Sequence, residues 1–320
     1  MNYLITGSNG FIGFHLVNFL TSKGHKVYGI DNLSSTSKKT QKLRSEILKK
    51  NKNFKFYNFD LKKKIKKNLI KKKISCIIHL AAQPGVRFSQ IWPNETLENN
   101  IKGYINLLDF AKEKNIKNIF YASSSSVYGN SNNFNEKILA GNNLTSVYAV
   151  SKLTTELISN VYNRLYKINF IGLRFFTVYG SYGREDMAYY KFLNQIVKNK
   201  KITIYGKKNF RRSFTSVNDV VICIYKLLLF FKKKKKFNNI FNIGNPEEIS
   251  LRTMISSIKI NFPSRFREVY LKKDLSDVDI TKSNMKLFFK KISKIKFIDF
   301  NDGYKIFVDW YCREILKWKT

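Results

Sequence analysis

Short apolar runs alternate with longer amphipathic stretches through the first half of the chain. Runs rich in Val, Ile, Tyr and Phe predict strands at 3–6, 26–30, 54–59, 75–80, 118–123 and 168–176. Apolar positions at helical spacing predict helices over 11–22, 37–50, 96–114 and 146–166. Repeated strand–helix–strand units indicate an α/β fold with a doubly wound parallel sheet and helices on both faces.

The pattern loosens beyond residue 179 into short elements joined by Gly, Asn and Lys loops. We expect a smaller C-terminal α/β lobe that closes over the carboxyl edge of the sheet, where such folds bind ligands. The chain is therefore divided into a cofactor-binding domain at 1–178 and a substrate lobe at 179–320. Segments of the second part can return to the sheet.

The segment 220–231 is apolar apart from Lys226, and five lysines follow it. Its twelve residues fall short of the roughly 20 that span a bilayer. We expect a buried helix whose final lysines favour the negative end of its dipole, with no stable membrane association. An interfacial membrane anchor is the less favoured alternative.

Composition places the chain among globular proteins. Its 320 residues are 43% hydrophobic and 25% charged, which excludes collagenous and disordered classes. The three cysteines, Cys76, Cys223 and Cys312, lie far apart, which excludes a disulfide scaffold and a structural zinc site. No metal is expected. The opening residues do not resemble a secretory signal, so we expect a cytoplasmic location.

The formal net charge is +37, which invites a nucleic-acid interpretation. However, the lysines recur on nearly every predicted helix and loop, as solvated faces do, and do not gather with aromatic residues on one element. We therefore expect no nucleic-acid partner. The positive field should instead speed the encounter with an anionic substrate.

A glycine-rich turn follows the first predicted strand. The sequence Gly7-Ser8-Asn9-Gly10-Phe11-Ile12-Gly13 leads directly into a helix, which is typical of a Rossmann dinucleotide site. Asp31 ends the second strand, where a carboxylate accepts both ribose hydroxyls and repels a 2′-phosphate, so the predicted cofactor is NAD. Asp60 ends the third strand near the expected adenine, although a strand-end cap is almost as good an explanation. The predicted cofactor contacts are Gly7, Asn9, Gly10, Phe11, Ile12, Gly13, Asp31, Asn32, Asp60, Leu61, Ala81, Tyr148 and Lys152.

Tyr148 and Lys152 stand four residues apart, on one face of a predicted helix. A free tyrosine has a pKa near 10 and is a poor base at neutral pH. The lysine ammonium and the positive nicotinamide ring are expected to lower the pKa of Tyr148, which makes it a general base. Four serines, 123–126, end the fifth strand and place hydroxyl groups near that site.

These motifs resemble the extended short-chain dehydrogenase/reductases, and among them the UDP-glucuronate 4-epimerase family. The resemblance runs from Met1 to about Tyr311, and the segment 177–188 is its part most specific to uronate enzymes. It implies NAD-dependent epimerisation of UDP-glucuronate to UDP-galacturonate through a transient 4-keto sugar, with NAD tightly bound. It also implies a homodimer formed through the helices at 96–114 and 146–166.

The resemblance assigns roles residue by residue. Tyr148 removes the O4 proton, Lys152 holds the nicotinamide ribose, and Ser124 hydrogen-bonds O4, with Ser125 and Ser126 as alternatives. Arg184 and Thr177 match the positions that grip the sugar carboxylate. Arg87 matches another active-site arginine, Arg212 the diphosphate clamp, and Tyr205 the residue that packs on uracil.

Other activities of this superfamily remain as alternatives. A UDP-glucose or UDP-N-acetylglucosamine 4-epimerase is the main rival. Dehydratases and uronate decarboxylases carry an acidic residue before the Val-Tyr-Gly step, and Ser126 occupies that position here. A non-catalytic nucleotide-binding protein should lack Tyr148 or Lys152, and both are present.

Overall fold

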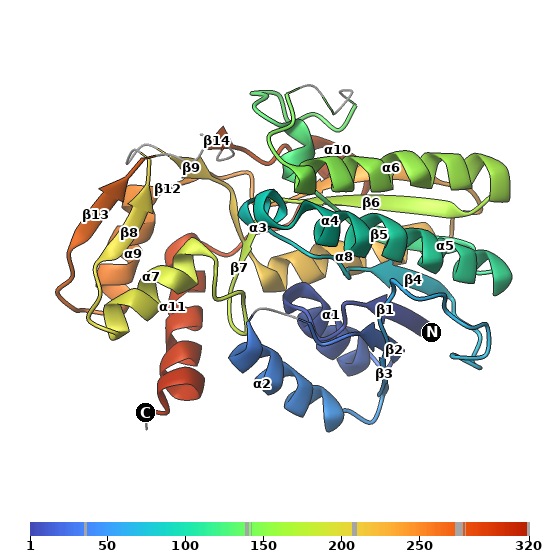
Figure 1. Cartoon of the computed structure of the whole chain (residues 1–320), viewed down its shortest axis with the longest axis horizontal. Coiled ribbons are helices and arrows are strands. Elements are labelled where there is room, and N and C mark those ends of the chain that lie inside the picture. The colour runs from blue at the N-terminus through green and yellow to red at the C-terminus, as the bar shows by residue number, and fades with distance from the viewer. Residues whose placement is uncertain are drawn as a thin grey trace.

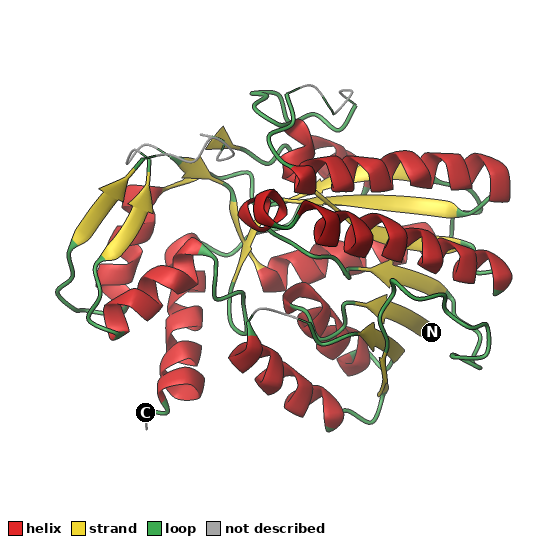
Figure 2. Cartoon of the chain, in the orientation of Figure 1, coloured by secondary structure: helices red, strands yellow, loops and turns green. Residues whose placement is uncertain are grey.

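The computed structural model contains a seven-stranded parallel sheet flanked by helices (Figures 1 and 2). It describes residues 1–34, 37–137, 141, 143–206, 210–272, 278 and 280–318. The strand order is β11-β6-β5-β4-β1-β2-β3, which confirms the predicted doubly wound α/β sheet. The strands are β1 (Asn2–Thr6), β2 (Lys26–Asp31), β3 (Phe54–Asn58), β4 (Cys76–His79), β5 (Asn118–Ser124), β6 (Asn169–Phe175) and β11 (Asn238–Ile243).

The two faces of the sheet bury separate apolar clusters. On β1, Tyr3 and Ile5 join one cluster while Leu4 joins the other, as the period of two in a strand requires. Helices α1 (Phe11–Ser22) and α8 (Val217–Lys232) pack against the first cluster, and α5 (Gly103–Glu113) against the second. The helices on the two faces are completed by α2 (Lys38–Lys49), α6 (Val147–Tyr166) and α10 (Lys286–Lys291).

The predicted continuous helix at 96–114 is wrong in detail. The segment forms α4 (Pro93–Leu97), a π-helical turn (Glu98–Lys102) and then α5, and the short α3 (Val86–Ile91) precedes it. The side chain of Asn100, inside the π-helical turn, donates to the Gln83 carbonyl at 3.1 Å and to the Ser151 hydroxyl at 2.9 Å. These long-range bonds accompany a local widening that the apolar spacing does not reveal.

Later segments form a second, smaller body beside the sheet (Figure 1). Its core is rich in aromatic residues, including Tyr189, Tyr190, Tyr304 and Phe307. Its helices are α7 (Ala188–Val197), α9 (Leu251–Asn261) and α11 (Phe300–Trp310), and a π-helical turn at Tyr311–Leu316 follows. Its strand pairs are β8 (Ile202–Tyr205) with β13 (Glu268–Leu271), β7 (Thr177–Tyr179) with β10 (Phe214–Ser216), and β9 (Arg211–Arg212) with both β12 (Ile249–Ser250) and β14 (Ile280–Thr281).

The predicted buried helix at 220–231 lies within α8, which packs on α1 and the sheet. No helix in the described part of the chain is long and apolar enough to span a membrane. Both α8 and β11 come from the second half of the sequence, yet they pack with the sheet of the first half. The proposed boundary at 178/179 stays a prediction.

Candidate active site

The glycine turn between β1 and α1 is tight because backbone atoms approach one another closely. Gly7 has a φ of +69°, and its carbonyl accepts from the Gly10 amide at 3.0 Å. A Cβ placed on Gly13 would lie 2.0 Å from the Gly7 oxygen. Gly10 caps α1 without a side chain, so the amides of the first helical turn are left for an anion. The turn therefore fits the pyrophosphate of a dinucleotide.

We expect Gly13→Ala to remove bound dinucleotide and to lower the free energy of unfolding by about 1–3 kcal/mol, the usual range for overpacking. The added methyl group meets a backbone oxygen that cannot rotate away. Thermal unfolding and the absorbance of cofactor released from denatured protein measure both effects. Gly24→Asn is the control, because Gly24 has a φ of +76° with open space around it. Normal cofactor content in Gly13→Ala would contradict the assignment.

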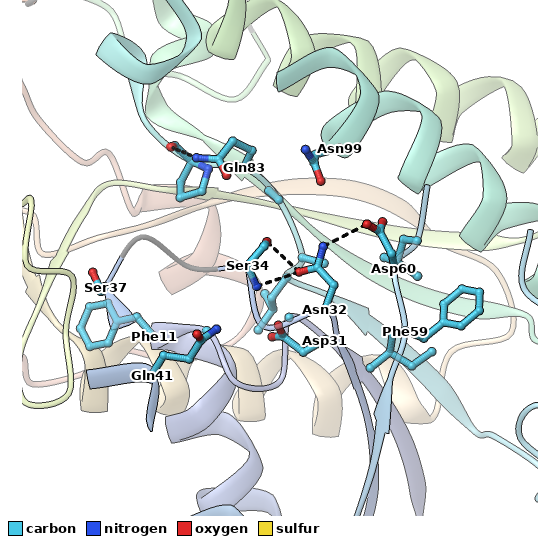
Figure 3. A pocket seen from close by; sticks show the side chains of 18 of the residues that line it. Phe11, Asp31, Asn32, Ser34, Ser37, Gln41, Phe59, Asp60, Gln83 and Asn99 are labelled. Carbon is cyan, nitrogen blue, oxygen red and sulfur yellow. Dashed lines mark hydrogen bonds between the residues drawn. The ribbon is translucent and has the colours of Figure 1, made fainter. Parts of the chain in front are cut away.

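A pocket opens at the carboxyl edge of the sheet, beside this turn (Figure 3). Two of its lining residues are bonded to each other, because Asn32 donates to Asp60 at 3.3 Å. Eight of the predicted cofactor contacts line it: Gly7, Gly10, Phe11, Asp31, Asn32, Asp60, Leu61 and Ala81. Other lining residues were not predicted from the sequence, among them Ser34, Ser37, Gln41, Arg44, Phe59, Lys62, Gln83 and Asn99.

Asp31 is held in place by backbone amides. Its two carboxylate oxygens accept from the amides of Asn9 at 3.0 Å and Leu33 at 2.9 Å. Burial raises the pKa of Asp31, and these hydrogen bonds with the nearby Arg44 charge oppose that rise. Asn9 does not itself line the pocket, but its backbone bonds to Asp31 and Arg44, which do. Ile12 and Gly13 are likewise absent from the lining residues.

Arg44 is a cationic residue that lines this pocket and was not predicted. It is buried, and its Nε donates to the Asn9 carbonyl at 2.7 Å while Nη1 donates to the Tyr182 carbonyl at 2.6 Å. Burial lowers the pKa of Arg44 to about 10, against the opposing effect of Asp31. In the sequence it is one of several basic residues on a charged helix, so no local pattern sets it apart. The tertiary contacts alone make it a link between the glycine turn and the segment 180–187.

Tyr148 and Lys152 lie one turn apart on α6, as predicted. The Lys152 Nζ is 5.9 Å from the centre of the Tyr148 ring and donates to the Ala122 carbonyl at 2.8 Å. Ser124 is the serine that hydrogen-bonds to the Tyr148 side chain. Its hydroxyl also donates to Ser126 at 3.1 Å, and Ser125 begins the 3-10 turn Ser125–Tyr128. The fold therefore brings Tyr148, Lys152 and Ser124 together.

The protein's own groups do not produce the predicted fall in the pKa of Tyr148, which also invoked the nicotinamide ring. Burial raises the pKa of Tyr148, and the charge of Arg184 and the hydrogen bond with Ser124 oppose this without reversing it. Lys152 directs its ammonium at a backbone carbonyl, and burial lowers its own pKa to about 8. The positive charge of an oxidised nicotinamide ring would favour the phenolate when NAD is bound.

The predicted substrate residues are dispersed around this centre. Arg184 lines the pocket, and its charge reaches Tyr148. Thr177 begins β7, outside the pocket lining. The Arg87 guanidinium carbon lies 4.1 Å from the Tyr205 ring centre, which brings two predicted residues together across α3 and β8. Arg212 on β9 donates to the Val278 carbonyl, away from the pocket.

Comparison with known proteins decides the family. The model of the NAD dependent epimerase/dehydratase family matches residues 3–244. The chain belongs to this family. It is 34% identical to a UDP-glucuronate 4-epimerase of Thermodesulfobacterium geofontis over 96% of this chain and 95% of that one. It is 36% identical to protein CapI of Staphylococcus aureus, over 97% and 98% of the two chains.

A solved structure agrees with this family membership. The UDP-glucuronic acid 4-epimerase of Bacillus cereus, in complex with UDP-glucuronic acid and NAD, superposes with a TM-score of 0.91 at 28% identity. The superposition covers 99% of this chain and 100% of that one. The predictions of an enzyme of the epimerase family, of NAD as its cofactor and of a Rossmann-type fold are confirmed.

Proposed function

We propose that this family member is a UDP-hexuronate 4-epimerase that interconverts UDP-glucuronate and UDP-galacturonate. The observation that carries the proposal is Arg184, whose guanidinium lines the cofactor pocket and acts electrostatically on Tyr148. An arginine fork suits a planar carboxylate. The names of two similar proteins, from Thermodesulfobacterium geofontis and Bacillus cereus, support the same substrate.

The residues around Tyr148 provide a route for a proton. Bound NAD supplies a site that accepts a hydride from C4 of the sugar and returns it. Tyr148 takes the O4 proton as that hydride leaves, and Ser124 holds O4 through a hydrogen bond. Lys152 holds the nicotinamide ribose. The 4-keto sugar then rotates to present its opposite face. Tyr148 returns the proton to O4, and C4 regains its hydride on that face. The reaction therefore has no net redox change.

The sugar carboxylate creates a hazard for this chemistry. A ketone at C4 beside a carboxylate on C5 makes a β-keto acid, which can lose CO₂. Arg184 and Thr177 are proposed to hold the carboxylate in an orientation that resists this loss. Ser126 stands where the decarboxylases and dehydratases of the superfamily carry an acid. Epimerisation is therefore favoured over both alternatives.

Substrate preference tests the proposal directly. Purified protein, with no added NAD, is incubated with UDP-glucuronate or with UDP-glucose, and the products are followed by NMR. We expect turnover of UDP-glucuronate to exceed that of UDP-glucose by about tenfold or more, because an arginine–carboxylate pair forms only with the acid. Turnover of UDP-glucose alone would contradict the uronate assignment and favour the main rival.

A homodimer is proposed through α6. Its residues Val150, Leu157, Val161 and Leu165 are large, exposed and spaced along one helical face. A second copy of the chain would cover this face, as the family resemblance implies for the helices at 96–114 and 146–166. Light scattering after gel filtration should then give twice the chain mass.

The predicted cytoplasmic location stays a prediction, supported by the buried, unpaired Cys76 and Cys223.

A further inference from the structure

The segment that carries Arg184 is fixed to the cofactor side of the molecule. It joins β7 to α7. Arg44 on α2 donates to the Tyr182 carbonyl at 2.6 Å, on one side of Arg184. On the other side, the Thr40 hydroxyl donates to Glu185 at 3.3 Å. Both contacts come from α2, so the backbone around Arg184 has a defined position beside the pocket.

Within this segment, the Asp186 carboxylate accepts hydrogen bonds from one edge of the Arg184 guanidinium. The Arg184 Nε donates to Oδ1 at 3.0 Å, and Nη2 donates to Oδ2 at 2.6 Å. Two parallel bonds of this kind fix the plane of the guanidinium as well as its place. Burial acts to raise the pKa of Asp186, but the charge and hydrogen bonds of Arg184 lower it by more. The pair is therefore ionised on both sides.

The other edge of the guanidinium is available to a ligand. A guanidinium carries five N–H donors, and the bonds to Asp186 use one on Nε and one on Nη2. Nη1 donates to no group in the described parts of the chain. Arg184 lines the pocket, and its charge reaches Tyr148. A planar acid bound in front of Tyr148 can thus take the end edge through Nη1 and the second Nη2 hydrogen.

We propose that Asp186 is a positioning residue that makes the site selective for an acidic sugar. It holds the side edge of Arg184, so that the end edge is already oriented for the carboxylate of a UDP-hexuronate. An arginine without this partner would lose more side-chain freedom when it bound the acid. A neutral sugar has no carboxylate and gains nothing from the orientation. The inference rests on the proposed function.

The test is Asp186→Asn in the full-length enzyme with its bound cofactor. An asparagine presents an NH₂ group to one guanidinium donor and so releases the fixed edge. We expect the KM for UDP-glucuronate to rise about tenfold while kcat changes less than about twofold, because an Arg184 that Asp186 no longer orients loses more side-chain freedom when it binds the acid. The affinity for UDP-glucose, measured by calorimetry, should not change. Asp186→Glu restores a carboxylate and should recover part of the loss.

Glu185→Gln is the matched control. It removes the same charge from the adjacent position. Unlike Asp186, however, Glu185 contacts Thr40 on α2 and Ser37 just before that helix. In Glu185→Gln, the ratio of the affinity for UDP-glucuronate to the affinity for UDP-glucose should equal that of the wild type. A ratio that falls as far as in Asp186→Asn would show a general charge effect and overturn the proposal.

Two further results would reject the inference while leaving the proposed function intact. A lower KM in Asp186→Asn would mean that Asp186 competes with the substrate for Arg184. An equal loss of affinity for both sugars would mean that Asp186 only stabilises the segment. A wild-type enzyme that does not epimerise UDP-glucuronate is a different outcome, because it removes the proposed function and the inference together.

Discussion

Tyr148→Phe is expected to lower the epimerisation rate by about 10²–10⁴-fold, the range for loss of a general acid–base group. The phenylalanine keeps the ring on α6 but removes the hydroxyl that bonds to Ser124. NAD should remain bound, because the glycine turn and Asp31 lie on other elements of the pocket. NMR of the sugar nucleotide measures the rate, and absorbance of the released cofactor measures occupancy.

A second tyrosine on the same helix provides the control for this variant. Tyr166 ends α6, and its ring contacts the Lys112 ammonium at 4.4 Å from the centre, far along the helix from Tyr148. Tyr166→Phe makes the same chemical change and should retain wild-type turnover. Substantial activity in Tyr148→Phe would show that another group removes the O4 proton, and would refute the proposed role.

Glu156→Gln is expected to lower the free energy of unfolding by about 3–5 kcal/mol, as breaking a buried ion pair does. Glu156 on α6 accepts from Arg174 on β6 at 2.9 and 2.7 Å, and both side chains are almost fully buried. The substitution leaves the Arg174 charge inside the protein without a counter-ion. Ser123, which precedes Ser124 in the chain, also donates to Glu156. The substitution therefore changes a hydrogen bond next to the active-site serine as well.

Chemical denaturation compares this variant with two others. Replacing the pair together, by Glu156→Leu with Arg174→Met, removes both charges and should recover much of the stability. Glu314→Gln removes the charge that pairs with Arg313 and with Lys317 at the surface. It should change the free energy of unfolding by less than about 0.5 kcal/mol. A Glu156→Gln protein as stable as the Glu314→Gln protein would contradict the assigned role of the buried pair.

Local sequence patterns predicted the elements well wherever neighbours in the chain determine the structure. The predicted helix at 11–22 coincides with α1, and the six predicted strands lie within two residues of β1 to β6 at either end. The Tyr148–Lys152 pair needed only the spacing of one helical turn. These features depend on hydrophobic period, glycine placement and i,i+4 geometry, all of which lie within a few residues of sequence.

Contacts between distant segments could not be predicted in this way. Arg44 resembles the solvated lysines around it in sequence, and only the fold buries it against Asn9 and Tyr182. The effect of burial on Tyr148, which opposes the phenolate, is a property of the assembled site and was not part of the prediction. Arg184 and Asp186 are only two residues apart, but the fold alone brings the charge of Arg184 to the pocket and to Tyr148.

The sequence by itself determined the α/β class, the dinucleotide turn and the tyrosine–lysine helix, because short-range spacing specifies each of them. The tertiary structure alone decided how β11 joins the sheet, why the helix at 96–114 widens at Asn100, and which charged groups act on Tyr148 and Asp31. Burial and long-range hydrogen bonding set those features, and neither quantity exists until segments far apart in the chain have packed together.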